Sequence, residues 1–86
     1  MKFSWTNIKN QFANNMEILL EIQTEVTHKH IKDWEVEHLL GKCRYDAKCF
    51  VGNVENGNLM AAAWECGHLD VHMQQLMEAM VPYQED

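Results

Sequence analysis

Two cysteines and two histidines between residues 43 and 72 have the chemistry of a metal-binding set. His68 and His72 are four residues apart, so a helix that begins before them places both imidazoles on one face. Cys66 precedes this pair by two residues, and in a hairpin over 43–64 Cys43 lies towards the same end. Two thiolates and two imidazoles form a tetrahedral zinc set. A zinc-stabilised module built on these four residues is therefore the alternative functional hypothesis.

The spacing of these residues does not match that of known structural zinc sites. No pair shows the short Cys-x2-Cys or Cys-x4-Cys separation of a zinc knuckle. The competing interpretation has the cysteines as small apolar core residues and the histidines on a helix flank. Because this interpretation needs no cofactor, we expect the protein to function without one.

Catalysis has little support in the sequence. Cys66 and His68 are the residue types of a nucleophile and its base, but a nucleophile also needs an oxyanion-stabilising turn. The chain has neither a glycine-rich phosphate loop nor a basic patch with interleaved aromatic residues. We expect a protein that is not an enzyme.

Methionines in the last segment are candidates for contact with another protein. Met73, Met77 and Met80 fall on one side of a predicted helix, and methionine suits surfaces that repack against a partner. The competing interpretation places this stripe in the core. Ile18 is a fourth candidate, because it lies outside the apolar stripe of the first helix and close to the glutamates.

Charge is distributed unevenly along the chain, whose formal net charge is −6. Residues 1–32 carry four lysines and three glutamates, whereas residues 33–86 carry three basic and ten acidic residues. Such an acidic chain repels phosphate, which argues against binding of nucleic acid or anionic lipid. A partner protein with a basic surface is the natural complement.

The 86 residues predict a single compact domain over 1–86. No apolar run is long enough to cross a membrane, and the first residues do not resemble a signal peptide. The three cysteines are an odd number, which favours free thiols in a reducing compartment. We therefore expect a cytoplasmic protein.

Helical periodicity is clearest at the two ends of the chain. A long amphipathic helix is predicted over about 5–29 and a short one over about 33–40, which Asp33 caps and Gly41 stops. A further helix is predicted over about 69–80, followed by a loose tail over 81–86.

The segment 43–64 is open to two interpretations. Its first half alternates with a period of two, and Asn56-Gly57 is the preferred sequence of a two-residue hairpin turn. Against this, the run 59–64 is rich in good helix formers. We predict an α+β fold with a β-hairpin at 43–64; the alternative is a small all-α domain with a helical hairpin.

A short part of the sequence resembles an ankyrin repeat. The resemblance is carried by Gly57-Asn58 and by the run Gly67-His68-Leu69-Asp70-Val71. The Thr-Pro-Leu-His segment, the 33-residue period and a second copy are all absent. The resemblance implies helix–turn–helix geometry in this region and thereby favours the helical alternative.

Together these features predict a small, acidic, non-enzymatic protein that binds another protein and regulates or inhibits it. The expected contact residues are Ile18, Met73, Met77 and Met80. Homodimerisation through the first helix is a second expectation, because a domain of this size buries little surface alone.

Overall fold

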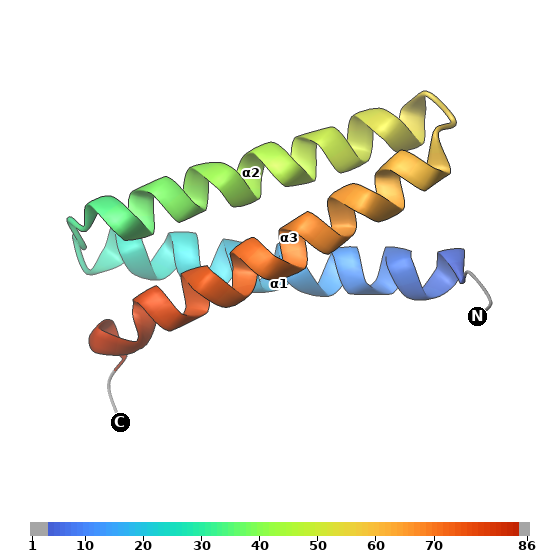
Figure 1. The fold of residues 1–86 in the computed structure, drawn as a ribbon. Helices are drawn as coiled ribbons and strands as arrows, with labels where there is room; N and C mark the ends of the chain where they lie inside the picture. The colour runs from blue at the N-terminus through green and yellow to red at the C-terminus, as the bar shows by residue number, and fades with distance from the viewer. Residues whose placement is uncertain (1–3, 85–86) are drawn as a thin grey trace.

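The structure, a computed structural model, describes residues 4–84 and is helical throughout, apart from short connections. It consists of α1 (Trp5–His28), α2 (Trp34–Glu55), α3 (Leu59–Met80) and a final 3-10 turn, η1 (Val81–Tyr83) (Figure 1). No strand occurs between residues 4 and 84, so the predicted α+β fold is wrong. The protein is the small all-α domain that was the alternative.

The three helices run up, down and up. α2 and α3 form an antiparallel pair with the most extensive contact in the domain, and α1 crosses this pair in the same direction as α3. The start of α1 and the η1 turn therefore lie at opposite ends of an elongated body of 39 × 23 × 16 Å. The ends of α1 and α3 lie at the same end of the body but diverge there, and the groove described below lies between them.

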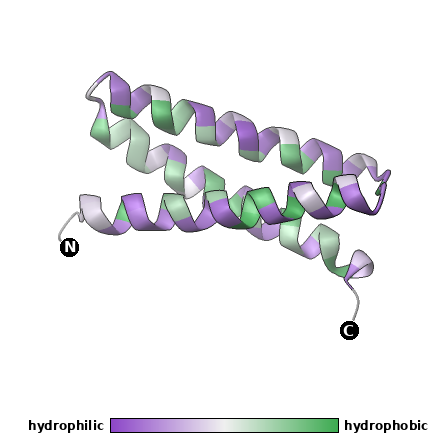
Figure 2. Cartoon of the chain, turned by 180° about the vertical axis from the view of Figure 1, so that it is seen from behind, coloured by the Kyte–Doolittle hydropathy of each residue, from purple (hydrophilic) through white to green (hydrophobic). Residues whose placement is uncertain are grey.

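Apolar side chains from all three helices form two adjoining core clusters. The larger one includes Leu19 of α1, Leu40 of α2 and Leu76 of α3, and the smaller one is centred on Phe50. Phe50 stacks on Phe12 with ring centroids 4.0 Å apart, which joins α2 to the first half of α1. Hydrophobic and hydrophilic segments alternate along all three helices, as expected where each helix buries one side (Figure 2).

Gly41 does not stop the second helix, which was predicted to end at about residue 40. α2 continues to Glu55, and Gly41 lies on its exposed side. A glycine inside a helix costs about 1 kcal/mol relative to alanine. Burial of Cys43, Ala47 and Phe50 beyond it offsets this cost. α3 likewise runs through Gly67 and starts ten residues before the predicted helix over 69–80.

Asn56-Gly57 ends a helix and does not turn a hairpin. Gly57 has φ +74°, its N–H donates to Val54 O at 3.0 Å, and the Asn58 N–H donates to Asn53 O at 2.8 Å. This pair of hydrogen bonds is the Schellman motif, in which glycine adopts a left-handed conformation just after the helix. A two-residue hairpin turn requires the same conformation, so the sequence signal was real but had two structural meanings.

The end of α1 has the same motif with a less favourable residue. The His30 N–H donates to Thr27 O at 3.3 Å, and the Ile31 N–H donates to Val26 O at 3.0 Å. His30 has φ 53°, where a side chain is strained, while Ile31 is buried in the larger core cluster. The buried Ile31 holds this turn in place.

Introducing glycine at the first turn and removing it from the second are expected to change the free energy of unfolding in opposite directions. His30→Gly should raise the free energy of unfolding by about 1 kcal/mol, and Gly57→Ala should lower it by about as much. Urea denaturation measures both. Gly67→Ala, inside a helix and with open space around the glycine, is the control and should stabilise. If His30→Gly lowered the free energy of unfolding, the inference that the backbone of His30 is strained would be wrong.

Asp33 caps α2, as the sequence predicts, and also ties it to the end of the chain. Its Oδ1 accepts hydrogen bonds from the N–H groups of Glu35 at 2.9 Å and Val36 at 3.3 Å. Its Oδ2 accepts from the Tyr83 hydroxyl. The hydrogen bond from Tyr83, followed by that from Val36, lowers the pKa of Asp33. The same contact raises the pKa of Tyr83.

The lowered pKa makes the contribution of this cap dependent on pH. A carboxylate with a depressed folded-state pKa stabilises fully above its ordinary value of 3.8, and this contribution is lost as pH falls through the folded-state pKa. Asp33→Ala should therefore lower Tm at pH 7, with a difference that shrinks in strong acid. Asp33→Asn, which keeps the capping oxygen, should retain most of the stability without this pH dependence. If Asp33→Ala lowered Tm by the same amount at pH 7 and in strong acid, the proposed contribution of the ionised Asp33 cap would be contradicted.

Candidate functional site

A groove of about 400 Å³ lies between the second half of α1 and the end of the chain. α1 contributes Ile18 and Ile22, α3 contributes Met77 and Met80, and η1 contributes Tyr83. Met77 and Met80 are three residues apart, so they project from the same side of α3 towards α1. The groove is therefore a surface of mixed polar and apolar character, built by segments about 60 residues apart in the sequence.

The apolar lining has a buried floor and an accessible edge. Ile22 and Met80 belong to the larger core cluster and form the floor. Ile18 is half-buried against the same cluster, and the side chain of Met77 is 41% exposed. A ligand in the groove can therefore contact Ile18 and Met77 directly.

Acidic side chains border the groove along α1. Glu17, Glu21 and Glu25 are exposed at four-residue spacing, and Glu21 and Glu25 line the groove itself. Lys29 pairs with Glu25 at 2.9 Å and donates to Tyr83 O at 3.2 Å, which places a positive charge at the far end. The charged side chains that line the groove, Glu21, Glu25 and Lys29, therefore carry a net charge of −1.

The predicted contact residues fall into two groups. Ile18, Met77 and Met80 all line the groove, although they come from different helices. Met73 is 1% exposed and lies in the larger core cluster. One side of α3 thus starts inside the core at Met73 and reaches the groove one turn later.

The four predicted zinc ligands do not come together. Cys43 lies in the larger core cluster and Cys66 in the smaller one, where its Sγ donates to Ile8 O at 3.8 Å. His68 and His72 contact carboxylates at the α2–α3 interface instead. The two thiols pack towards α1, so no common centre exists for all four side chains.

Burial also makes two thiols unreactive. Burial raises the pKa of Cys43 to about 11, and it raises the pKa of Cys66, with a smaller contribution from the charge of Asp70. Both thiols are therefore protonated at neutral pH, whereas nucleophilic attack requires the thiolate. Cys49, on α2, is only half-buried.

Alkylation should distinguish the three cysteines. In the folded protein we expect iodoacetamide to modify Cys49 at least about ten times faster than Cys43 or Cys66, because only Cys49 reaches solvent. Mass spectrometry of peptides after timed labelling measures the three rates. In denaturant the rates should converge. Fast modification of Cys66 in the folded state would contradict its burial and restore it as a candidate nucleophile.

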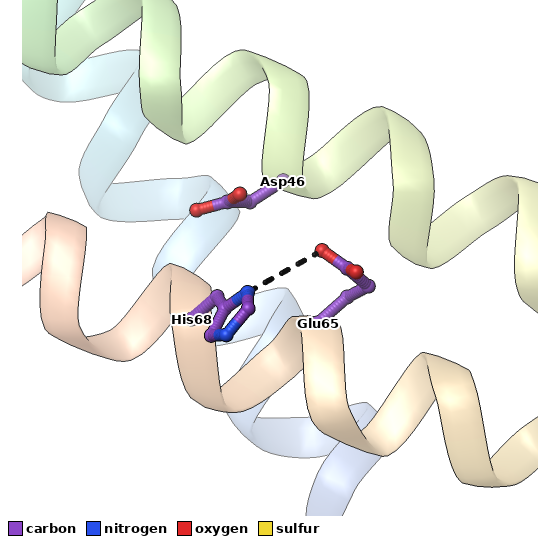
Figure 3. Close-up of side chains that lie close together, drawn as sticks. All are labelled: Asp46, Glu65 and His68. Carbon is purple, nitrogen blue, oxygen red and sulfur yellow. Dashed lines mark ion pairs between the residues drawn. The ribbon is translucent and has the colours of Figure 1, made fainter.

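A polar cluster at the α2–α3 interface was missed by the sequence analysis. Asp46 of α2 faces Glu65 and His68 of α3, and each of the three offers a ligand atom within 4.8 Å of the others (Figure 3). His72, one turn further along α3, contacts the Asp46 carboxylate through Nδ1. The sequence could have indicated this cluster through Asp46, an acidic residue on the buried side of α2. That position follows only if residues 43–55 are predicted to form a helix.

Trp34 and Trp64, two exposed aromatic residues, do not share one surface patch. Trp34 stacks on His38 at the start of α2, and Trp64 contacts His68 near the start of α3. Because α2 and α3 are antiparallel, these two tryptophans lie towards opposite ends of the helix pair. These two tryptophans therefore do not build a common binding surface.

Comparisons with protein-family models, curated proteins and solved structures return no match. Within residues 4–84, no helix is long and apolar enough to cross a membrane. Function is therefore inferred from the residues and their geometry.

Proposed function

We propose that this chain binds a partner protein by accepting a basic amphipathic helix in the groove between α1 and α3. The observation that carries the proposal is a groove whose apolar floor is bordered by carboxylates of α1. Ile18 and Met77 offer the apolar contact, while Glu21 offers the charge, since Glu25 already pairs with Lys29. A helix with an apolar side chain flanked by lysine or arginine matches both features.

Apolar burial supplies most of the affinity in this arrangement. Burying one large apolar side chain contributes about 1.5–3 kcal/mol, whereas an exposed ion pair contributes about 0.2–1 kcal/mol. The glutamates therefore serve mainly to select a basic partner and to orient it. Methionine at position 77 suits this role, because its flexible side chain adapts to different apolar shapes.

The charge of the whole chain supports the same class of partner. A net charge of −6 accelerates encounter with basic proteins and disfavours nucleic acid and anionic lipid. Occupying the groove would mask a helix of the partner, and regulation or inhibition of that partner is the proposed consequence. The three free thiols fit the reducing cytoplasm, which is the proposed location.

Site-specific cross-linking tests this proposal. A photo-reactive amino acid at Met77 should capture a partner in a lysate of the source cells, and mass spectrometry should find the cross-link in a lysine- or arginine-rich amphipathic helix. The same group at Met60, which is exposed at the start of α3, is the control position. Glu21→Lys should reduce capture at Met77 by about ten-fold, because it replaces attraction at the groove edge by repulsion.

Glu55→Lys is the matched charge control, since it changes the net charge equally at the far end of α2. Capture that falls as much with Glu55→Lys, or equal capture from Met60 and Met77, would contradict binding in the groove. Cross-links to a second copy of the chain would replace the proposal by a homodimer. Light scattering would then give twice the monomer mass of 10.1 kDa.

A further inference from the structure

The α2–α3 interface holds a second cluster of chemically active side chains, away from the groove. Asp46 projects from α2 towards two consecutive turns of α3, where Glu65 and His68 project back towards it (Figure 3). The Nδ1 atom of His68 lies 3.9 Å from Oε2 of Glu65, and ligand atoms of all three residues lie within 4.8 Å of one another. The arrangement brings together two carboxylates and an imidazole.

The burial of Asp46 is the unusual feature of this cluster. Its side chain belongs to a residue only 4% exposed, and Asp46 is the one buried charged residue in the part of the chain that the structure describes. Burying a carboxylate is costly unless a cation or several hydrogen bonds compensate for it. Between residues 4 and 84 its side-chain partner is the imidazole of His72, which carries a charge only when protonated, and no lysine or arginine there pairs with it. A divalent cation would supply the missing positive charge.

We propose that Asp46, Glu65 and His68 bind one divalent transition-metal ion of the zinc class. Imidazole nitrogen and carboxylate oxygen are both zinc ligands, at about 2.0–2.2 Å from the ion. Ligand atoms at those distances in a tetrahedron are separated by about 3.4 Å. Rotation of the partly exposed Glu65 and His68 side chains closes the present separation. Water completes the coordination on the exposed side.

His72 acts by positioning Asp46. Its Nδ1 contacts Oδ2 of Asp46, and an ionised carboxylate only accepts hydrogen bonds, so this nitrogen carries the proton. The other carboxylate oxygen stays available for the ion. A hydrogen-bonded partner of this kind fixes the orientation of a ligand, and removing one weakens metal affinity by about 10–100-fold.

The proposed set shares His68 with the set predicted from the sequence but contains no thiol. Cobalt(II) distinguishes the two, because thiolate ligation gives an intense ultraviolet charge-transfer band that nitrogen and oxygen ligands do not give. The purified, reduced full-length protein should bind one equivalent of cobalt(II) with visible absorption and without that band. Zinc should displace it stoichiometrically.

Calorimetric titration with zinc then assigns the ligands. His68→Ala and Glu65→Gln should each weaken zinc binding at least about ten-fold, and His72→Ala should weaken it by a similar factor. His68 is exposed and Glu65 and His72 are half-buried, so each variant should remain folded, which circular dichroism checks. His28→Ala removes an exposed histidine at the end of α1 and should leave zinc affinity unchanged.

Three outcomes would overturn the proposal. The first is no binding of zinc or cobalt at millimolar concentration by the folded wild-type protein. The second is a charge-transfer band that disappears when Cys49 is replaced by serine, since this would place the ion on a thiolate. The third is a loss of affinity with His28→Ala as large as that with His68→Ala, which would show binding to surface histidines in general.

Discussion

The structure depends on one constraint: Leu19, Leu69 and Leu76 are all buried where α1 crosses the antiparallel pair of α2 and α3. Each is almost fully removed from solvent, and burial of one such side chain contributes about 1.5–3 kcal/mol. Because α1 crosses α3 at an angle, the two helices separate towards their ends. The side chains between the separating ends line the groove, so the apolar floor of the candidate site continues directly from the core.

Polar contacts have a different role in this fold. Asp70 of α3 accepts hydrogen bonds from the side chains of Gln11 and Asn15 of α1. These contacts fix the axial register of α1 against α3. Such surface contacts contribute about 1 kcal/mol each, less than a buried leucine. The Asp46 cluster is different, because a buried carboxylate lowers stability unless it is compensated. The proposed role of Asp46 is therefore binding of an ion, whereas Asp70 serves the fold.

The sequence predicted the features that depend on local spacing. The first helix, the Asp33 cap and the shared position of Met77 and Met80 all follow from residues a few positions apart. The hairpin at 43–64 failed because Asn56-Gly57 satisfies two motifs that both need a left-handed residue. Tertiary packing decided between them: α2 buries Cys43, Ala47 and Phe50 on one side, whereas a strand would place Phe50 on the face opposite Cys43 and Ala47. The carboxylate and imidazole cluster depends on the register of α2 against α3, which no local pattern contains.

Methionine methyl NMR tests the binding groove most directly, because four of the six methionines report on three distinct environments. Met77 and Met80 line the groove, Met73 lies in the core, and Met60 is exposed near the α2–α3 turn. The protein is titrated with a synthetic amphipathic helix of leucine and lysine, and with a control peptide in which glutamate replaces every lysine. We predict that the basic peptide shifts the Met77 and Met80 methyl signals while Met60 stays unchanged, and that the acidic peptide shifts neither. Unchanged Met77 and Met80 signals at saturating basic peptide, or equal shifts at Met60, would contradict the proposed function.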